Sequence, residues 1–162
     1  MATQPLEYQP LDRPTIRQTP VLMPAARGAS RYLAPFGRLL FSAIFLMSVP
    51  THFMRDTVAY AAQSGVPLPA IAVPATGVIL LLGGLSVLLG YYARIGAWLL
   101  VLFLVPVALM MHDFWIYADP MMRQMQMAHF MKNFSMAGAA LLIAYFGAGP
   151  MSLDAKLARQ GS

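Results

Sequence analysis

The 162-residue sequence contains no cysteine, and only 10% of its residues are charged. An average soluble domain has about 25% charged residues. The absence of cysteine excludes thiolate metal sites, iron–sulfur ligation, dithiol relays and haem attached through a Cys-x-x-Cys-His motif. We therefore expect no covalently bound cofactor, and redox chemistry here requires a group held by other side chains.

Hydrophobic residues, in contrast, make up 59% of the chain. A chain of this length has too much surface for its volume to bury so much apolar material, so the composition predicts contact with a lipid bilayer. The net charge of +5 comes from 11 basic and 6 acidic residues. Because the basic residues are not clustered with aromatic ones, the charge argues against nucleic acid as a partner.

Four apolar segments predict an all-α fold, an integral membrane four-helix bundle, because about 20 residues cross the hydrocarbon core. The expected spans are residues 37–54, 71–93, 95–115 and 129–148. Asp119 followed by Pro120 is typical of a helix start, so the last helix is predicted to begin at Pro120. A short polar break around Arg94 predicts a tight antiparallel hairpin between the second and third spans.

The segments outside the bundle, which covers residues 37–155, are predicted to be tails. Residues 1–36 hold six prolines without a helical or strand period, which is typical of a flexible segment. Residues 156–162 form a second, short tail. Six basic residues near the spans fall on the side of the termini and three on the other side, so both termini are predicted to be cytoplasmic, with the protein in a bacterial inner membrane.

Small residues are expected where the helices pack closely, since close backbone approach holds helices together in lipid. In the second span these are Gly83, Gly84 and Gly90. In the fourth span they are Ser135 and Gly138.

All three histidines are predicted on the outer side of the membrane, at ends of the spans. Together with neighbouring polar residues they form the candidate site: His52, His112, Asp113, His129, Lys132 and Asn133. Ionisable groups near a membrane are costly and are candidates for function. If the third and fourth spans touch, Asp113 can pair with Lys132 and orient His112.

Three interpretations of this group remain open from the residues alone. The histidines can be interfacial residues without a role. They can line a pocket that binds a quinone head and passes protons, because imidazole titrates near ambient pH. They can also contribute to a copper site with Met122, Met125 and His129, which share one helical stripe, although Lys132 in the same stripe would repel a metal ion.

Several short segments, in this order and spacing, resemble one family. They are Gly37-Arg38, YAAQSGVPLP (60–69), LLLGGLSVLLGYYARIGAW (80–98), HDFW (112–115), KNFSMAGAALL (132–142) and GAGPMSLD (147–154). On these segments the sequence resembles the DoxX family of small four-span membrane proteins. Relatives often carry a glutamate where this chain has Leu80, and a lysine near the position of His52.

The resemblance implies a function as a membrane subunit of a quinone-linked or redox-stress oxidoreductase complex, similar to the small subunit of a thiosulfate:quinone oxidoreductase. It implies a partner subunit or a homo-oligomer, quinone as the small molecule, and no catalytic activity of the chain's own. The alternative is a membrane scaffold or binding protein, with copper handled at the outer face.

Overall fold

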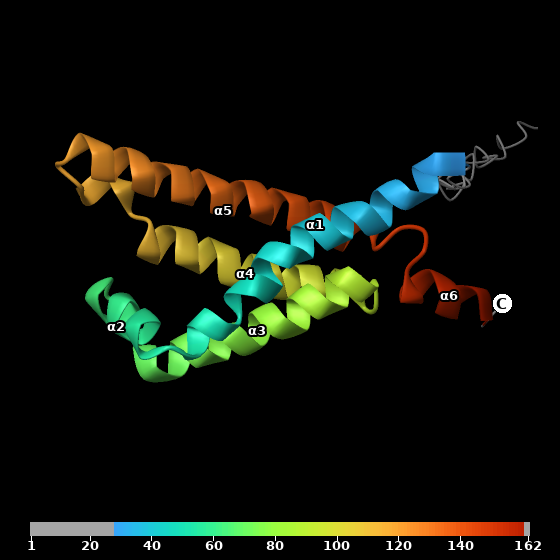
Figure 1. Cartoon of the computed structure of the whole chain (residues 1–162), viewed down its shortest axis with the longest axis horizontal. Coiled ribbons are helices and arrows are strands. Elements are labelled where there is room, and N and C mark those ends of the chain that lie inside the picture. The colour runs from blue at the N-terminus through green and yellow to red at the C-terminus, as the bar shows by residue number, and fades with distance from the viewer. Residues whose placement is uncertain (1–27, 161–162) are drawn as a thin grey trace, which may run out of the picture.

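The structure, a computed structural model, describes residues 28–160 (Figure 1). This part of the chain is entirely helical, as predicted, and contains no strand. Its α-helices are α1 (Leu33–Ser48), α2 (Arg55–Gln63), α3 (Pro69–Leu89), α4 (Ala93–Met111), α5 (Pro120–Phe146) and α6 (Leu153–Gln160). Short 3-10 turns occur at η1 (Gly28–Tyr32), η2 (Pro50–Phe53) and η3 (Phe114–Ile116).

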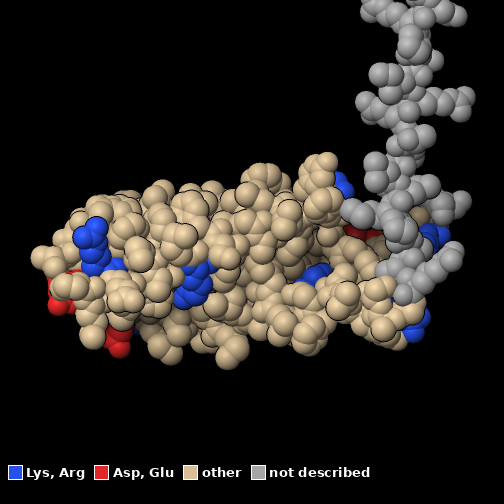
Figure 2. All heavy atoms as spheres, turned by 90° about the horizontal axis from the view of Figure 1, so that it is seen from above, with Lys and Arg blue, Asp and Glu red and all other residues tan. Residues whose placement is uncertain are grey.

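Three helical segments in the described range are long and apolar enough to cross a membrane. They are Gly28–Phe53, Pro69–Leu89 and Ala93–Ile116. Many of their apolar side chains face outward; Leu40, Leu82 and Leu102 are each more than half exposed. Charged atoms gather mainly toward the two ends of the elongated molecule, and most of the visible face is uncharged (Figure 2). This distribution is that of a protein surrounded by lipid.

The first span differs from its predicted bounds at both ends. Helix α1 begins at Leu33 instead of residue 37, so the predicted tail is structured over its last residues; its residues 1–27 lie outside the described part. Pro35 is tolerated because amides in a first helical turn have no helical acceptor. The helix ends at Ser48 instead of residue 54, since Pro50 starts the 3-10 turn η2.

The hairpin between α3 and α4 is confirmed, but the break is not at Arg94, which lies inside α4. The chain turns at Gly90–Tyr92, where Gly90 (φ 64°) and Tyr92 (φ 47°) are left-handed. The Ser86 hydroxyl donates to the carbonyls of Tyr91 at 2.7 Å and Tyr92 at 3.0 Å, so the turn is closed by side-chain hydrogen bonds.

Helix α5 begins at Pro120, as predicted. The Asp119 carboxylate accepts a hydrogen bond from the Met122 amide at 2.7 Å, which caps the free amides of the first turn. The helix runs over 27 residues and packs along α4.

Helix α4 is central: it packs against α3 and α5, while α1 packs against α3. The core contains Leu100 and Leu104 of α4 together with Leu80, the residue at the glutamate position, which is fully buried. A Cβ at Gly83 would lie 3.0 Å from the Gly96 carbonyl oxygen, so a glycine is needed for this close approach.

The small residues of α5 do not behave as predicted. Ser135 and Gly138 are exposed, and a Cβ on Gly138 would meet nothing within 4 Å. The buried face of α5 instead carries Asn133, Ala137 and Ala140. These residues share one side of the helix, because positions three, four and seven apart are neighbours on its surface.

At one end of the molecule, the Arg38 end, a hydrogen-bond network joins three distant segments. The buried Arg38 guanidinium donates to the carbonyls of Ala148 at 2.8 Å and Met151 at 2.9 Å. The Asp154 carboxylate accepts from the amides of Tyr92 at 2.8 Å and Ala93 at 3.1 Å, so α6 caps the start of α4. Helix α6 was not predicted; part of it was assigned to the tail at 156–162.

The opposite end, the cavity end, holds α2 and the connection between α4 and α5 (Figure 1). Helix α2 was also missed, although Met54, Val58 and Ala61 follow a helical spacing. It packs against η2 and α3.

Candidate functional site

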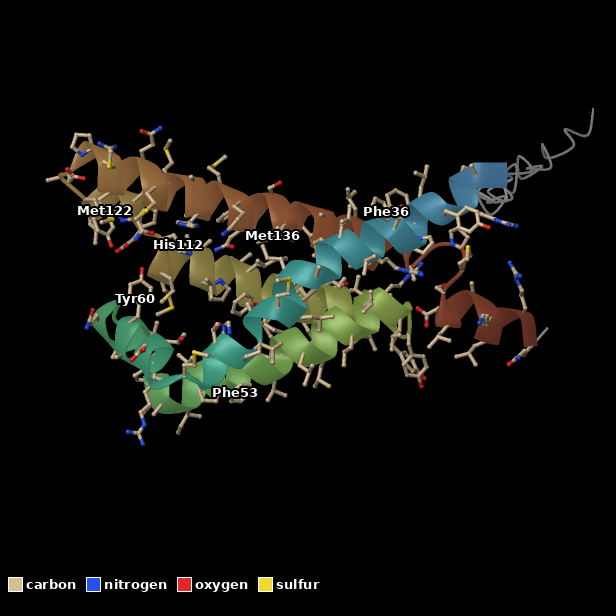
Figure 3. The ribbon with its side chains drawn as sticks, in the orientation of Figure 1. Phe36, Phe53, Tyr60, His112, Met122 and Met136 are labelled. Atoms are coloured by element: carbon tan, nitrogen blue, oxygen red, sulfur yellow. The ribbon has the colours of Figure 1, made fainter. Side chains whose placement is uncertain are left out.

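A cavity of about 490 Å³ lies at the cavity end, between α2, η2, α3 and α4. Its walls are mostly apolar, with side chains such as Val73, Phe103 and Val107. Five polar side chains also line it: His52, Thr57, Tyr60, Thr76 and His112. Tyr60 on α2 and His112 lie at this same end of the molecule (Figure 3).

His52 packs closely against α3 because Gly77 of that helix has no side chain. A Cβ on Gly77 would lie 2.9 Å from the His52 Cβ, so η2 can approach α3 only at a glycine. His52 Nδ1 donates to the Ser48 carbonyl at 2.9 Å, and its ring meets the Phe103 ring edge-on at 5.7 Å between centroids. The imidazole is therefore fixed in orientation by its own turn and by α4.

His112 follows the last residue of α4 and links that helix to α5. Its Nδ1 donates to Gln126 Oε1 at 2.8 Å, and its ring stacks on His129 with 5.1 Å between centroids and 24° between planes. Gln126 is buried, so this hydrogen bond is shielded from competition with water.

Lys132 extends this group toward the surface. Its ammonium donates to His129 Nδ1 at 3.2 Å. Because an ammonium has no lone pair, the contact requires a His129 that is unprotonated at this nitrogen. His112, His129 and Lys132 thus form a continuous series from the cavity to the exposed surface.

His52 and His112 lie at different depths in the cavity. His52 contacts Phe103, and His112 follows nine residues later along α4. At 1.5 Å per residue this corresponds to about 13 Å along the helix. A single small head group therefore reaches one imidazole at a time.

The predicted pairing of Asp113 with Lys132 is wrong: the two residues form no ion pair within residues 28–160, where the lysine contacts His129. Helix α4 ends at Met111, and His112 has φ −133°, so Asp113 leaves the helical register and precedes η3. Asn133 is buried on α5, and its Nδ2 has no hydrogen-bond partner. Neither Asp113 nor Asn133 lines the cavity.

The residues of the predicted copper stripe lie on α5, and copper binding there stays a prediction. Met122 and Met125 are exposed, and His129 contacts His112 and Lys132. Within the described range, no group of three or more histidine and carboxylate side chains could hold a metal ion.

Sequence reasoning missed two parts of the site. Gln126 orients His112, and its only signal in the sequence is a polar residue three positions before His129 on the same helix face. Tyr60 and Thr57 were missed together with α2, which forms one wall of the cavity.

Comparisons with known proteins agree with the resemblance seen in the sequence. The DoxX family model matches residues 33–113, half of the chain, and this range includes every residue that lines the cavity. The inner membrane protein YphA of Escherichia coli (strain K12) is 34% identical over 98 residues, which are 60% of this chain and 69% of that protein. No solved structure matches significantly. The predicted location in the bacterial inner membrane is confirmed, and the chain belongs to the DoxX family of inner-membrane proteins.

Proposed function

We propose that this protein is the quinone-binding membrane subunit of an oxidoreductase complex, and that the cavity between α2 and α4 holds the quinone. The observation that carries the proposal is that two imidazoles, of His52 and His112, line a mostly apolar cavity of about 490 Å³. A quinone has a flat apolar ring with polar oxygens at its edge. Binding sites for such molecules combine apolar walls with a few fixed polar groups.

We propose that His112 exchanges protons with the bound quinone, and that water beside the exposed His129 and Lys132 completes the route to the surface. His112 lines the cavity, stacks on His129, and Lys132 binds His129 at the exposed surface. Quinone reduction consumes two protons and quinol oxidation releases two. Histidine suits this transfer because its protonation changes near ambient pH.

The electron donor is assigned to a partner protein subunit. The chain has no cysteine and so cannot hold an iron–sulfur cluster or a dithiol relay of its own. Its part in the reaction is to bind the quinone, orient it and exchange its protons.

We also propose that residues 129–148, which include the second half of α5, form a fourth span, and that both termini are cytoplasmic. The stretch from Phe134 to Phe146 is apolar and packs along α4. The start of α1, the α3–α4 turn and α6 meet at the Arg38 end, together with five basic residues of the described range: Arg31, Arg38, Arg94, Lys156 and Arg159. Basic residues favour the cytoplasmic side.

The orientation can be tested with a reporter that is active only in the periplasm, fused after Ser162. We expect no activity from this fusion and strong activity from the same reporter inserted between α4 and α5. Strong activity after Ser162 would reject the orientation, and activity at both positions would reject the fourth span.

Quinone binding can be tested with a photoreactive short-tailed quinone and the full chain in lipid nanodiscs. We expect crosslinks in the segments that line the cavity, 52–76 and 102–112, and their loss when an excess of unlabelled quinone is added. His112→Leu should reduce the crosslinking, whereas Met125→Leu, on the exposed face of α5, should leave it unchanged. Labelling that is spread over lipid-facing residues and resists competition would reject the proposal.

A further inference from the structure

We infer that the cavity selects the reduced quinol over the oxidised quinone, an inference that rests on the proposed function above. The reason lies in the direction of the hydrogen bonds around the cavity. Four of its five polar side chains already donate their proton to another protein group, so what they offer a ligand is lone pairs.

The two histidines show this most clearly. His52 Nδ1 lies 2.9 Å from the Ser48 carbonyl, and His112 Nδ1 lies 2.8 Å from Gln126 Oε1. Carbonyl and amide oxygens only accept, so in both rings Nδ1 carries the proton. A neutral imidazole carries one proton, so in the neutral form of each ring Nε2 is an acceptor.

The two threonines are committed in the same way. The Thr57 hydroxyl donates to the Thr51 carbonyl at 2.7 Å, and the Thr76 hydroxyl donates to the Val73 carbonyl at 2.7 Å. A hydroxyl has one proton and two lone pairs. After donating to the backbone, each threonine can only accept from a ligand.

The remaining wall adds acceptors and one mixed group. Pro106 has no N–H, so the carbonyl of Leu102, four residues earlier, lacks its usual helical donor; both residues line the cavity. Met110 and Met111 contribute thioethers, which accept weakly and cannot donate. Tyr60 is the lining side chain that can both donate and accept.

A wall of this kind distinguishes the two redox forms of one ligand. The oxygens of a quinone can only accept hydrogen bonds. Among the polar side chains of the wall, only Tyr60 offers them a donor. The hydroxyls of a quinol donate, so each can complete a hydrogen bond with an acceptor in the wall. A polar group that is desolvated without a partner loses more than the net value of one hydrogen bond, so we expect the quinol to bind about tenfold more tightly.

The test compares three ligands of the same ring and tail, bound anaerobically to the full chain in nanodiscs. They are the short-tailed quinol, the corresponding quinone, and the dimethyl ether of the quinol, which keeps both oxygens and lacks both protons. We expect the quinol to bind most tightly and the ether about as weakly as the quinone. If none of the three binds, the proposed function fails. If the quinone or the ether binds as tightly as the quinol, the inference fails while the proposed function stands.

Variants of the polar residues that line the cavity then test whether these residues cause the preference for the quinol. We expect His112→Leu or His52→Leu to remove most of the difference between the quinol and the ether, with a smaller loss for Thr76→Val. The matched control is Met125→Leu, on the exposed face of α5 and outside the cavity wall, and it should keep the preference. Losses of equal size for the quinol and the ether in both histidine variants would show a change of shape only and would overturn the inference.

Discussion

The polar side chains at the two ends of the molecule differ in how far along the chain their hydrogen-bond partners lie. At the Arg38 end, Arg38 and Asp154 bind backbone groups more than 60 residues away, and so hold together α1, the α3–α4 turn and α6. At the cavity end, His52, Thr57 and Thr76 donate to carbonyls three to six residues away. The long-range hydrogen bonds hold distant segments of the bundle together. The local hydrogen bonds occupy the protons of the cavity side chains and leave their lone pairs free to accept.

The difference predicts that substitutions at the Arg38 end change stability and that substitutions at the cavity end change ligand binding.

The largest expected effect is that of Arg38→Leu. The variant leaves the buried carbonyl oxygen of Ala148 and the part-buried one of Met151 without their donor. The expected loss in the free energy of unfolding is about 3–5 kcal/mol, because a hydrogen-bond acceptor that loses its donor inside the protein is not fully solvated by water. Thermal unfolding in detergent measures it, with the exposed Arg31→Leu as a control that should change the value little. Equal melting temperatures for both variants would contradict a structural role of Arg38.

The next prediction concerns two glycines whose replacement by alanine should change the free energy of unfolding in opposite directions. Gly90 has φ 64°, and a Cβ there would collide with Ser152 and lie 2.7 Å from Arg38 Nη1, so Gly90→Ala should destabilise the protein by about 2–3 kcal/mol. Gly138 lies in helix α5 with open space around it, so Gly138→Ala should stabilise the protein by about 0.5–1 kcal/mol. The same unfolding assay measures both, and a shift in the same direction for the two variants would refute the assignment.

Removing the carboxylate that caps α4 should lower the free energy of unfolding by less than Arg38→Leu or Gly90→Ala does. Asp154→Ala leaves the amides of Tyr92 and Ala93 without their acceptor, and the loss of a helix cap is worth about 1–2 kcal/mol. Asp154→Asn keeps one oxygen acceptor and should lose about half as much. If the asparagine variant is as unstable as the alanine variant, the effect is due to charge and not to capping.

At the cavity end, His112→Ala should lower quinone-linked activity about tenfold. It should also lower the free energy of unfolding by about 1–3 kcal/mol, because the buried Gln126 loses its partner. His52→Ala should lower activity less, because His52 contacts neither His129 nor Lys132 in the proposed proton route. The measurement is the rate of quinone reduction by membranes that contain each variant and the intact partner complex. A parent-like rate for His112→Ala would return the histidines to interfacial groups without chemistry.

The smallest effect is expected from Gln126→Leu. This variant removes the acceptor that holds His112 Nδ1 and lets the imidazole change tautomer, so the preference for quinol over its dimethyl ether should fall about threefold. If the leucine variant behaves like the parent, Gln126 is only a buried helix contact.

The sequence predicted the long elements of the fold well, because apolar length and capping are local signals. The start of α5 at Pro120 and the α3–α4 hairpin follow from such signals. Helices α2 and α6 have nine and eight residues, and neither has an apolar run, so only their packing against the long helices shows them.

The site was predictable in part for the same reason. The grouping of the histidines at one end follows from the alternation of the spans. The pairing of Asp113 with Lys132 failed because the end of α4 decides where Asp113 goes, and spacing along the chain does not contain that information. The acceptor character of His52 and His112 depends on the positions of the Ser48 carbonyl and of Gln126, which only the folded backbone sets.

The Asp154 cap has a consequence for biosynthesis. Residues 148–154 leave the ribosome after every helix that they join, so the α3–α4 hairpin enters the membrane with its first α4 amides still uncapped. The Asp154 amide also donates to the Gly90 carbonyl at 2.8 Å, which closes the turn from the other side. Insertion of the helices and closure of the bundle are therefore separate events in time. A chain that ends before residue 148 would lack both this cap and the acceptors of Arg38, so its Arg38 end would stay open.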